Sequence, residues 1–163
     1  MRIAADEARG LARSLLERAG APEAHATLQA DVLLEGELRG HPSHGLQRLP
    51  RLLTRIECGL ADPAATGTQS WRKTGLLDVD GNAGLGPVVA THAIDALLAR
   101  VSDTGVAVAA VRNANHLGML AGYVERIAAA GSVGVALSTS EALVHPHGGT
   151  SAMLGTNPIA VAV

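Results

Sequence analysis

The stretch LLDVDGNAGLGPVVATHAIDALLARVSDTGVAVAAV, residues 76–111, contains a strand–helix–strand pattern. LLDVD at 76–80 has the length and apolar character of a strand, and Pro87 suits the first turn of a helix. That helix carries four apolar residues on one face: Ile94, Leu97, Leu98 and Val101. GVAVAAV at 105–111 is a second apolar run of strand length. Unbroken apolar strands that alternate with helices predict a buried, largely parallel α/β sheet.

The pattern continues towards the C-terminus with a helix from Met119 to Ala130 and strands at 133–138 and 159–163. The last strand is rich in Val and Ala and needs cover on both faces, but few helices are left to provide it. We therefore expect the α/β fold to be incomplete at the C-terminus, with a partner or a continuation supplying the rest.

The first sixty residues favour helices over 6–19 and from Pro22 to Arg39, a short turn over 44–49, and a helix from Pro50 to Cys58. Residues 59–75 are rich in Gly, Ala and Thr and are interpreted as a loop. The predicted domains are a helical subdomain over 1–66, which would carry substrate-site residues, and the first part of an α/β domain over 67–163.

Composition excludes several classes of function. A net charge of −2, one Trp, one Tyr and no Phe argue against nucleic acid as a partner. The longest apolar runs fall far short of the roughly 20 residues of a membrane span, and the N-terminus lacks the apolar core of a signal peptide. The single cysteine, Cys58, cannot form an internal disulfide, so we expect a cytoplasmic protein.

The segment HPSHGLQR at 41–48 is the first candidate site. His44 and Arg48 are four residues apart and would share a face in a helical turn. The guanidinium would keep the imidazole neutral, and it offers two parallel donors to a substrate carboxylate. The alternative is a capping Ser43 followed by a surface histidine and arginine.

Polar residues also follow the apolar run at 105–111, in RNANHLG at 112–118. Ligands of open α/β sheets bind at the carboxyl ends of strands, which makes His116 a candidate acid/base. A capping Asn-His turn explains the same residues equally well.

Hydroxyls and glycines that could bind phosphate or amide groups follow later strands, in Ser138-Thr139-Ser140 and at 155–158. Turn formation alone also accounts for them. His145 and His147 lack acidic or Cys companions at ligand spacing, so we predict no metal site. The glycine order at 81–86 is G-x-x-G-x-G, which differs from the dinucleotide fingerprint and favours a simple turn.

Four segments together resemble the malate/L-lactate dehydrogenase family, in the family's order and over nearly the whole chain. They are SHGLQRLPRLLTRIECG (43–59), VDGNAGLG (79–86), VRNANHLGMLAGYVERIAAAG (111–131) and GGTSAMLGTNPIAVAV (148–163). The resemblance implies a non-Rossmann NAD(P)-binding fold, with NAD or NADP as cofactor. It also implies a homodimer that interconverts small 2-keto and 2-hydroxy acids such as malate, lactate, sulfolactate or ureidoglycolate, with reduction of cyclic imino acids in close relatives.

The same resemblance implies roles for individual residues. His116 matches the family's acid/base, Arg48 matches the residue that holds the substrate carboxylate, and Ser43 and His44 match pocket residues. Ser140 matches a cofactor contact, and Gly155, Thr156 and Asn157 lie in a stretch close to the cofactor.

Two residues depart from the family pattern: Leu52 replaces a frequent tyrosine that faces the substrate, and Thr139 replaces a frequent asparagine. Family members also continue well beyond the equivalent of Val163. The rival hypothesis is therefore a non-catalytic fragment or interaction module that cannot bind the cofactor alone. A histidine-based metal hydrolase ranks behind both.

Overall fold

The computed structural model describes residues 3–163, which divide into two compact units. The first unit ends at Met119, and the second comprises Leu120–Val163. The boundary that the sequence predicts between residues 66 and 67 falls inside the first unit and stays a prediction. Each unit is described by itself below.

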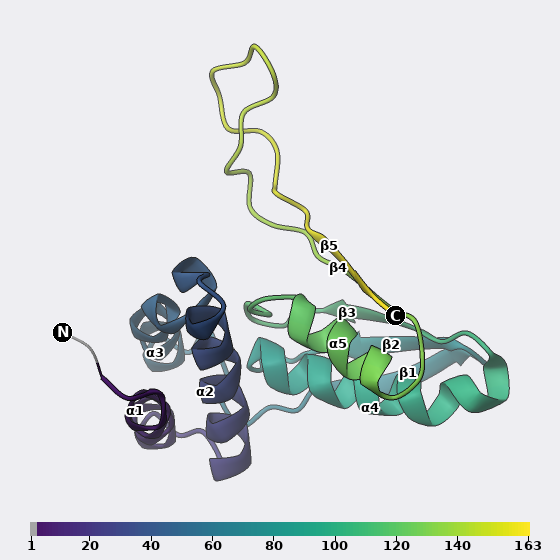
Figure 1. Ribbon diagram of the computed structural model, residues 1–163, viewed down its shortest axis with the longest axis horizontal. Coiled ribbons are helices and arrows are strands. Elements are labelled where there is room, and N and C mark those ends of the chain that lie inside the picture. Colours follow the sequence, from purple (N-terminus) through teal and green to yellow (C-terminus); the bar gives the residue numbers. More distant parts are fainter. Residues whose placement is uncertain (1–2) are drawn as a thin grey trace. The chain divides into compact units, whose positions relative to one another are not determined.

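The helical part of the first unit contains α1 (Ala5–Arg18), α2 (Glu23–Leu38) and α3 (Leu49–Glu57), and Figure 1 shows α1 and α2 crossing one another. Two short 3-10 turns, η1 (Pro42–His44) and η2 (Leu46–Arg48), connect α2 to α3. These bounds confirm the predicted helices and the predicted turn before Pro50. The helices begin and end where proline, glycine and charge placement indicate, because such signals act locally.

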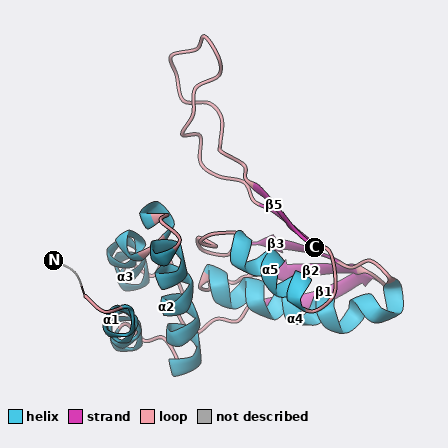
Figure 2. Cartoon of the chain, viewed as in Figure 1, coloured by secondary structure: helices cyan, strands magenta, loops and turns pink. Residues whose placement is uncertain are grey.

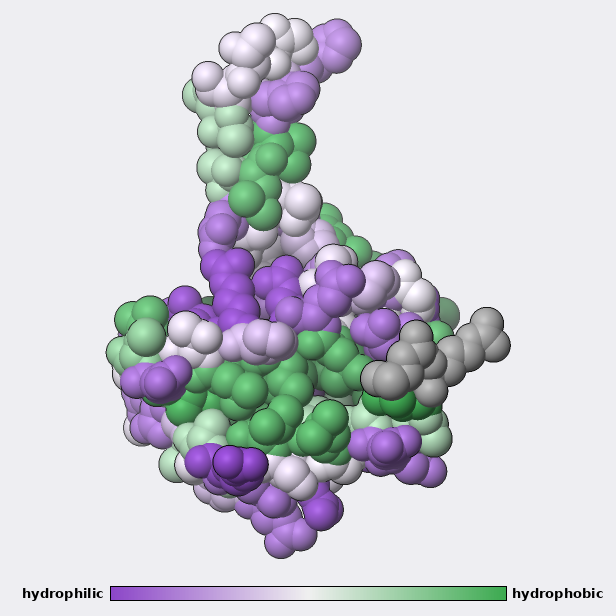
Figure 3. Space-filling view, turned by 90° about the vertical axis from the view of Figure 1, so that its left-hand side faces the viewer, coloured by the Kyte–Doolittle hydropathy of each residue, from purple (hydrophilic) through white to green (hydrophobic). Residues whose placement is uncertain are grey.

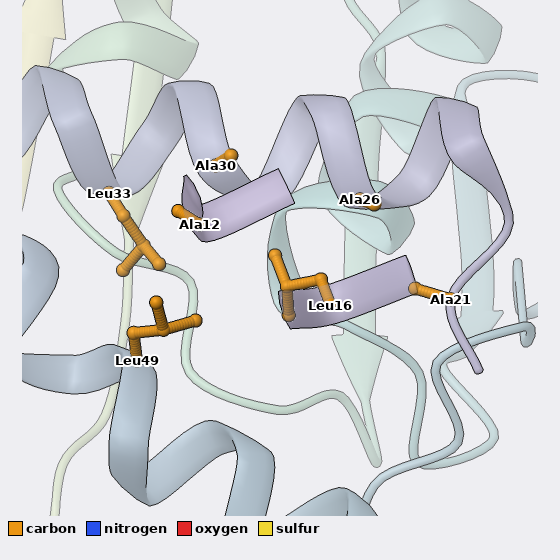
Figure 4. Packing of buried hydrophobic residues seen from close by; sticks show 7 residues of the cluster. All are labelled: Ala12, Leu16, Ala21, Ala26, Ala30, Leu33 and Leu49. Atoms are coloured by element: carbon orange, nitrogen blue, oxygen red, sulfur yellow. The ribbon is translucent and has the colours of Figure 1, made fainter. Parts of the chain in front are cut away.

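A small apolar core joins these three helices. Seven buried residues form it, as Figure 4 shows: Ala12, Leu16, Ala21, Ala26, Ala30, Leu33 and Leu49. Alanines at the α1–α2 crossing allow the helix backbones to approach closely, and Leu16, which is fully buried, fills the space between them. Truncating a buried leucine to alanine typically costs about 2–5 kcal/mol, so Leu16 is a main anchor of this core.

The sheet of the first unit has three strands in the order β1 (Thr68–Lys73), β2 (Leu76–Asp80) and β3 (Val108–Arg112). Strand β2 runs antiparallel to β1 and parallel to β3, and α4 (Gly86–Thr104) makes the connection from β2 to β3. Leu77 and Val79 of β2 pack against Val89 and Ala93 of α4 in a second buried cluster. The strand–helix–strand prediction for residues 76–111 is confirmed.

Three details of the sequence prediction are wrong. Part of the segment interpreted as a loop, residues 59–75, is strand β1. The sheet is also not largely parallel, because β2–β3 is the one parallel pair among the described strands. Strand β3 is also not buried on both faces, since its Val108 and Val111 are 52% and 39% exposed.

The second unit contains α5 (Ala121–Ala129), β4 (Gly134–Leu137) and β5 (Ile159–Ala162). The two strands pair antiparallel, and α5 packs on them. The segment between them, residues 138–158, extends beyond the strand pair as a long loop in Figure 2. A bridge between Val144 and Leu154 joins the two sides of that loop near its middle, and Ser140 bonds to Thr156 and Asn157 nearer the strands.

Many large apolar side chains of the second unit face solvent. Figure 3 shows hydrophobic residues along the protruding loop, where Leu143 and Met153 are 66% and 68% exposed. Val135, Leu137, Ile159 and Val161 are also more than half exposed on the strand pair. Across the described residues, no helix combines the length and apolarity that a membrane crossing requires.

Candidate active site

His116 lies in an irregular segment that follows β3, at the carboxyl end of that strand. Its Nδ1 atom accepts a hydrogen bond of 2.9 Å from the backbone N–H of Gly118. A nitrogen that accepts a hydrogen bond carries no proton, so the neutral ring has its proton on Nε2. The Nε2–H group can therefore act as a donor towards a ligand.

The segment from 41 to 48 is held against α2 by main-chain contacts. The N–H of His41 donates to the carbonyl of Gly36 at 2.8 Å, and the N–H of Leu46 donates to the carboxylate of Glu37 at 3.2 Å. Because Gly45 is extended between the two 3-10 turns, His44 and Arg48 do not share one helical turn as the sequence interpretation assumed.

Ser43, His44 and Arg48 nevertheless form a connected group. The Ser43 hydroxyl lies 3.1 Å from Nδ1 of His44, and Nε of Arg48 donates to the Ser43 carbonyl at 2.6 Å. Partial burial lowers the pKa of His44, and the positive charge of Arg48 lowers it further. The predicted effect of the guanidinium on the imidazole is therefore present, although burial is the larger cause.

The tertiary structure brings His44 and His116 together, with ring centroids 5.5 Å apart and ring planes tilted by 43°. Burial lowers the pKa of His116 to about 4, with further contributions from the charges of Arg48, His44 and Arg51. His116 keeps part of its surface exposed, so a small molecule in solvent can reach it. The result is a neutral imidazole donor in a positively charged surrounding, which suits an anionic ligand.

The glycine cluster at 81–86 packs beneath the histidine segment. The N–H of Ala83 donates to the carbonyl of Asn113 at 2.8 Å, and the N–H of Asn115 donates to the carbonyl of Gly84 at 3.0 Å. Gly86 opens helix α4 where a Cβ atom would overlap the backbone carbonyls of His116 and Asn115. These contacts give the cluster a packing role that its glycine spacing did not reveal.

Sequence reasoning gave no role to Arg55 or to the side chain of Asn115. Nε of Arg55 donates to Oδ1 of Asn115 at 2.8 Å, which ties α3 to the histidine segment. Arg55 follows Arg48 by seven residues, which is about two helical turns. This spacing was the signal in the sequence that could have indicated a role for Arg55 near the site.

The four residues predicted to contact a cofactor come together in the second unit. The N–H of Thr156 donates to the Ser140 hydroxyl at 2.8 Å, and the N–H of Ser140 donates to Oδ1 of Asn157 at 3.1 Å. Gly155 lies so close to Ser140 that an added Cβ would be 2.5 Å from the Ser140 carbonyl oxygen. The segments at 138–140 and 155–157 thus form one polar cluster.

His145 and His147 lie in the exposed protruding loop. Throughout residues 3–163, no three His, Cys, Asp or Glu side chains lie close enough together to hold a metal ion. A shallow groove lined by Arg9, Asp31, Leu34 and Glu35 occurs on the α1–α2 surface and contains none of the predicted site residues.

The sequence pattern of one protein family, described as malate/L-lactate dehydrogenase, matches residues 3–163. The chain belongs to the malate/L-lactate dehydrogenase family. Its similarity to a malate dehydrogenase of Pyrococcus abyssi is 37% identity over 99% of the chain, and to an L-sulfolactate dehydrogenase of Methanocaldococcus jannaschii it is 34% over 91%.

A solved structure supports this family assignment. The crystal structure of a dehydrogenase from Sinorhizobium meliloti matches with 54% identity and a TM-score of 0.96 over 99% of this chain. The resemblance inferred from the sequence motifs is therefore confirmed, and so is the α/β fold of the malate/L-lactate dehydrogenase type. The chain spans about half the length of the relatives it matches, between 43% and 48% for these three proteins.

Proposed function

We propose that this chain contributes the substrate-binding and proton-transfer half of an NAD(P)-dependent oxidoreductase that interconverts 2-keto and 2-hydroxy acids. The observation that carries the proposal is the juxtaposition of His116 with His44, in the electrostatic field of Arg48 and Arg51. The relatives named above as malate and sulfolactate dehydrogenases act on anionic hydroxy acids, which fits a site of this charge.

Arg48 would bind the substrate carboxylate. Its Nε atom is already bonded to the Ser43 carbonyl, which fixes the plane of the guanidinium and leaves the terminal nitrogens for a ligand. Two parallel hydrogen bonds from a planar guanidinium bind a carboxylate and also fix its orientation. Such a contact would set the position of C2 relative to His116.

His116 would hydrogen-bond the substrate oxygen through Nε2–H. When C2 of a keto acid accepts a hydride, its oxygen gains negative charge and takes up one proton, giving the hydroxy acid. A neutral donor beside that oxygen stabilises the developing charge. A bound carboxylate would also offset the charges of Arg48 and Arg51 and raise the pKa of His116, so that the ring could take up a second proton, deliver one proton to the substrate oxygen and return to its neutral form.

The cluster of Ser140, Gly155, Thr156 and Asn157 is the proposed cofactor contact. Its hydroxyl and amide groups match the donors and acceptors of a nicotinamide or ribose, and Gly155 lets its segment pack directly against Ser140. NAD(P)H, when bound, would supply the hydride. We propose NAD or NADP as the cofactor.

We further propose a cytoplasmic homodimer with a small 2-keto or 2-hydroxy acid as substrate, as the family resemblance implies. Leu52 packs against the helical core, which is consistent with a pocket less polar than that of members with tyrosine there.

One observation favours a second candidate function, that of a non-catalytic fragment or interaction module. The outer face of the β4–β5 pair carries Val135, Leu137, Ile159 and Val161, and each is more than half exposed. An apolar face of this kind is typical of a surface that another polypeptide covers. Aggregation that increases with concentration, without any binding of cofactor, would support this candidate.

The test of the enzyme proposal follows absorbance at 340 nm while the purified chain meets NADH or NADPH and a panel of 2-keto acids and cyclic imino acids. We expect turnover that collapses in His116→Ala and Arg48→Ala variants and persists in Arg13→Ala, an exposed arginine of α1. A folded chain without turnover, which binds neither cofactor in calorimetry, would refute the proposal and favour the fragment.

A further inference from the structure

We propose that Arg55 and Asn115 are a pair of positioning residues that fix the His116 segment against both α3 and the 81–86 turn. Neither residue is proposed to touch substrate, and the inference rests on the proposed role of His116. Its basis is a set of contacts that converge on one side chain, the amide of Asn115.

The Asn115 amide uses both its ends. Its Oδ1 atom accepts from Nε of Arg55 at 2.8 Å, and its Nδ2 atom donates to the carbonyls of Ala83 at 2.6 Å and Gly84 at 3.2 Å. The backbone N–H of Asn115 also donates to Gly84. A partly buried amide with all these partners has one orientation, because a flipped amide would place donor against donor and acceptor against acceptor.

Arg55 connects this amide to the helix that begins directly after Arg48. Its Nη2 atom donates to the Leu60 carbonyl at 3.4 Å, so the guanidinium is held at two points. The chain therefore runs from the proposed carboxylate-binding residue, along α3, to Arg55, and across one hydrogen bond to the neighbour of His116. These contacts hold Arg48 and His116, the two proposed catalytic residues, in a fixed position relative to one another.

The neighbouring amide, Asn113, has a different role. Its Nδ2 atom donates to both carboxylate oxygens of Asp80, at 3.2 and 3.1 Å, so that this amide is bonded to β2 and not to α3. Asn113 has a φ of 54°, which glycine adopts without strain. An Asn113→Gly variant is therefore a matched control that removes an amide from the same segment while leaving the Arg55 contact intact.

Arg55 variants also separate an effect of charge on the His116 pKa from an effect of ring position. The charges that lower the pKa of His116 belong to Arg48, His44 and Arg51, and Arg55 is not among them. Loss of the Arg55 charge should not by itself move that pKa. A change in an Arg55 variant would instead report that the imidazole has moved relative to its surroundings.

The experiment measures the pKa of His116 by NMR titration of the chain, together with its melting temperature, in Asn115→Ala, Arg55→Ala and Arg55→Lys. We expect the pKa to rise from about 4 by about one unit or more in both alanine variants, because a released segment becomes more hydrated. Arg55→Lys keeps a donor group at this position, so the rise in the His116 pKa should be smaller than in Arg55→Ala. Asn113→Gly should leave the pKa unchanged.

The double variant Arg55→Ala/Asn115→Ala should shift the pKa no further than Asn115→Ala alone, since Arg55 acts on the segment through its hydrogen bond to Asn115. In chains that turn over, kcat should fall by roughly 10²-fold with little change in KM. A lower melting temperature with an unchanged His116 pKa in both alanine variants would overturn the proposal and leave a purely structural contact.

These readouts separate the inference from the proposed function. If the pKa shifts as expected but the wild-type chain transfers no hydride, the positioning pair stands and the enzyme proposal fails. If the chain is active and the alanine variants keep both the pKa and kcat, the enzyme proposal stands and the positioning pair is refuted.

Discussion

The imidazole rings of His44 and His116 lie with their centroids 5.5 Å apart, although one follows α2 and the other follows β3. The charge of His44 lowers the pKa of His116, and the charge of Arg48 lowers the pKa of both rings. The histidines of the site are therefore neutral and its arginines are positively charged. This charge distribution suits an anionic substrate.

Acid should destabilise the fold through His116. Its pKa is lowered from 6.5 to about 4 in the folded chain, so the unfolded chain binds more protons between these values and stability falls as pH drops from 6.5 towards 4. Because the ring is partly exposed, we expect a loss of no more than about 2 kcal/mol. Denaturant unfolding of wild type and His116→Asn across this pH range measures the effect. The variant should lose less stability, and identical pH profiles would contradict the prediction.

The tautomer of His116 should be Nε2–H at neutral pH. The Gly118 N–H occupies Nδ1 of the ring at 2.9 Å, and a proton on that nitrogen would oppose the donor. Nitrogen-15 NMR distinguishes a pyrrole-type Nε2 from a pyridine-type Nδ1 directly. His145, which is exposed in the protruding loop, provides an internal reference in the same spectrum. A dominant Nδ1–H form of His116 would show that the observed hydrogen bond does not persist in solution.

Gly86→Ala should disturb the site through packing alone. The added Cβ would overlap the carbonyls of His116 and Asn115, and neither backbone group can rotate away as a flexible side chain would. We expect a loss of about 1–3 kcal/mol in the free energy of unfolding, measured with denaturant. Gly10→Ala in α1 is the matched control, since an added Cβ there meets nothing within 4 Å. That variant should gain up to about 1 kcal/mol.

Ser140→Ala should weaken cofactor binding. The hydroxyl accepts from the N–H of Thr156 at 2.8 Å and lies 3.2 Å from the Thr156 hydroxyl, so its loss loosens the proposed contact surface. The loss of one hydrogen bond should weaken the binding of NADH or NADPH by roughly 5–10-fold, measured by calorimetry. Ser138→Ala is the control, because its hydroxyl donates to the carbonyl of the neighbouring Thr139 at 3.3 Å and not across the loop. Equal affinity in both variants would remove Ser140 from the cofactor site.

The helices were the most predictable part of the fold. Pro22, Pro50 and Pro87 lie at or beside helix starts, and Gly20 and Gly59 follow helix ends, as the sequence interpretation placed them. Such signals depend on the local backbone, which the sequence specifies without reference to the rest of the chain. Strand β2, whose residues alternate between partly buried and buried, was equally predictable from the sequence.

Strand β1 could not be predicted in the same way. Its sequence TQSWRK is mostly polar and its residues are largely exposed, so no apolar alternation marks it. Pairing with β2 makes it a strand, and that pairing is antiparallel, which altered the predicted sheet. The exposure of β3 likewise depends on which elements cover it and not on its apolar sequence.

The sequence by itself determined the family of this chain and the identity of its candidate residues, because motif order and residue type are properties of the linear chain. Only the tertiary structure decided that His44 approaches His116 and that Arg55 reaches Asn115. These contacts join segments or atoms whose distances depend on the packing of α2, α3 and the 81–86 turn around the histidine segment. No local propensity encodes them, since they exist only once the buried cores have fixed those elements.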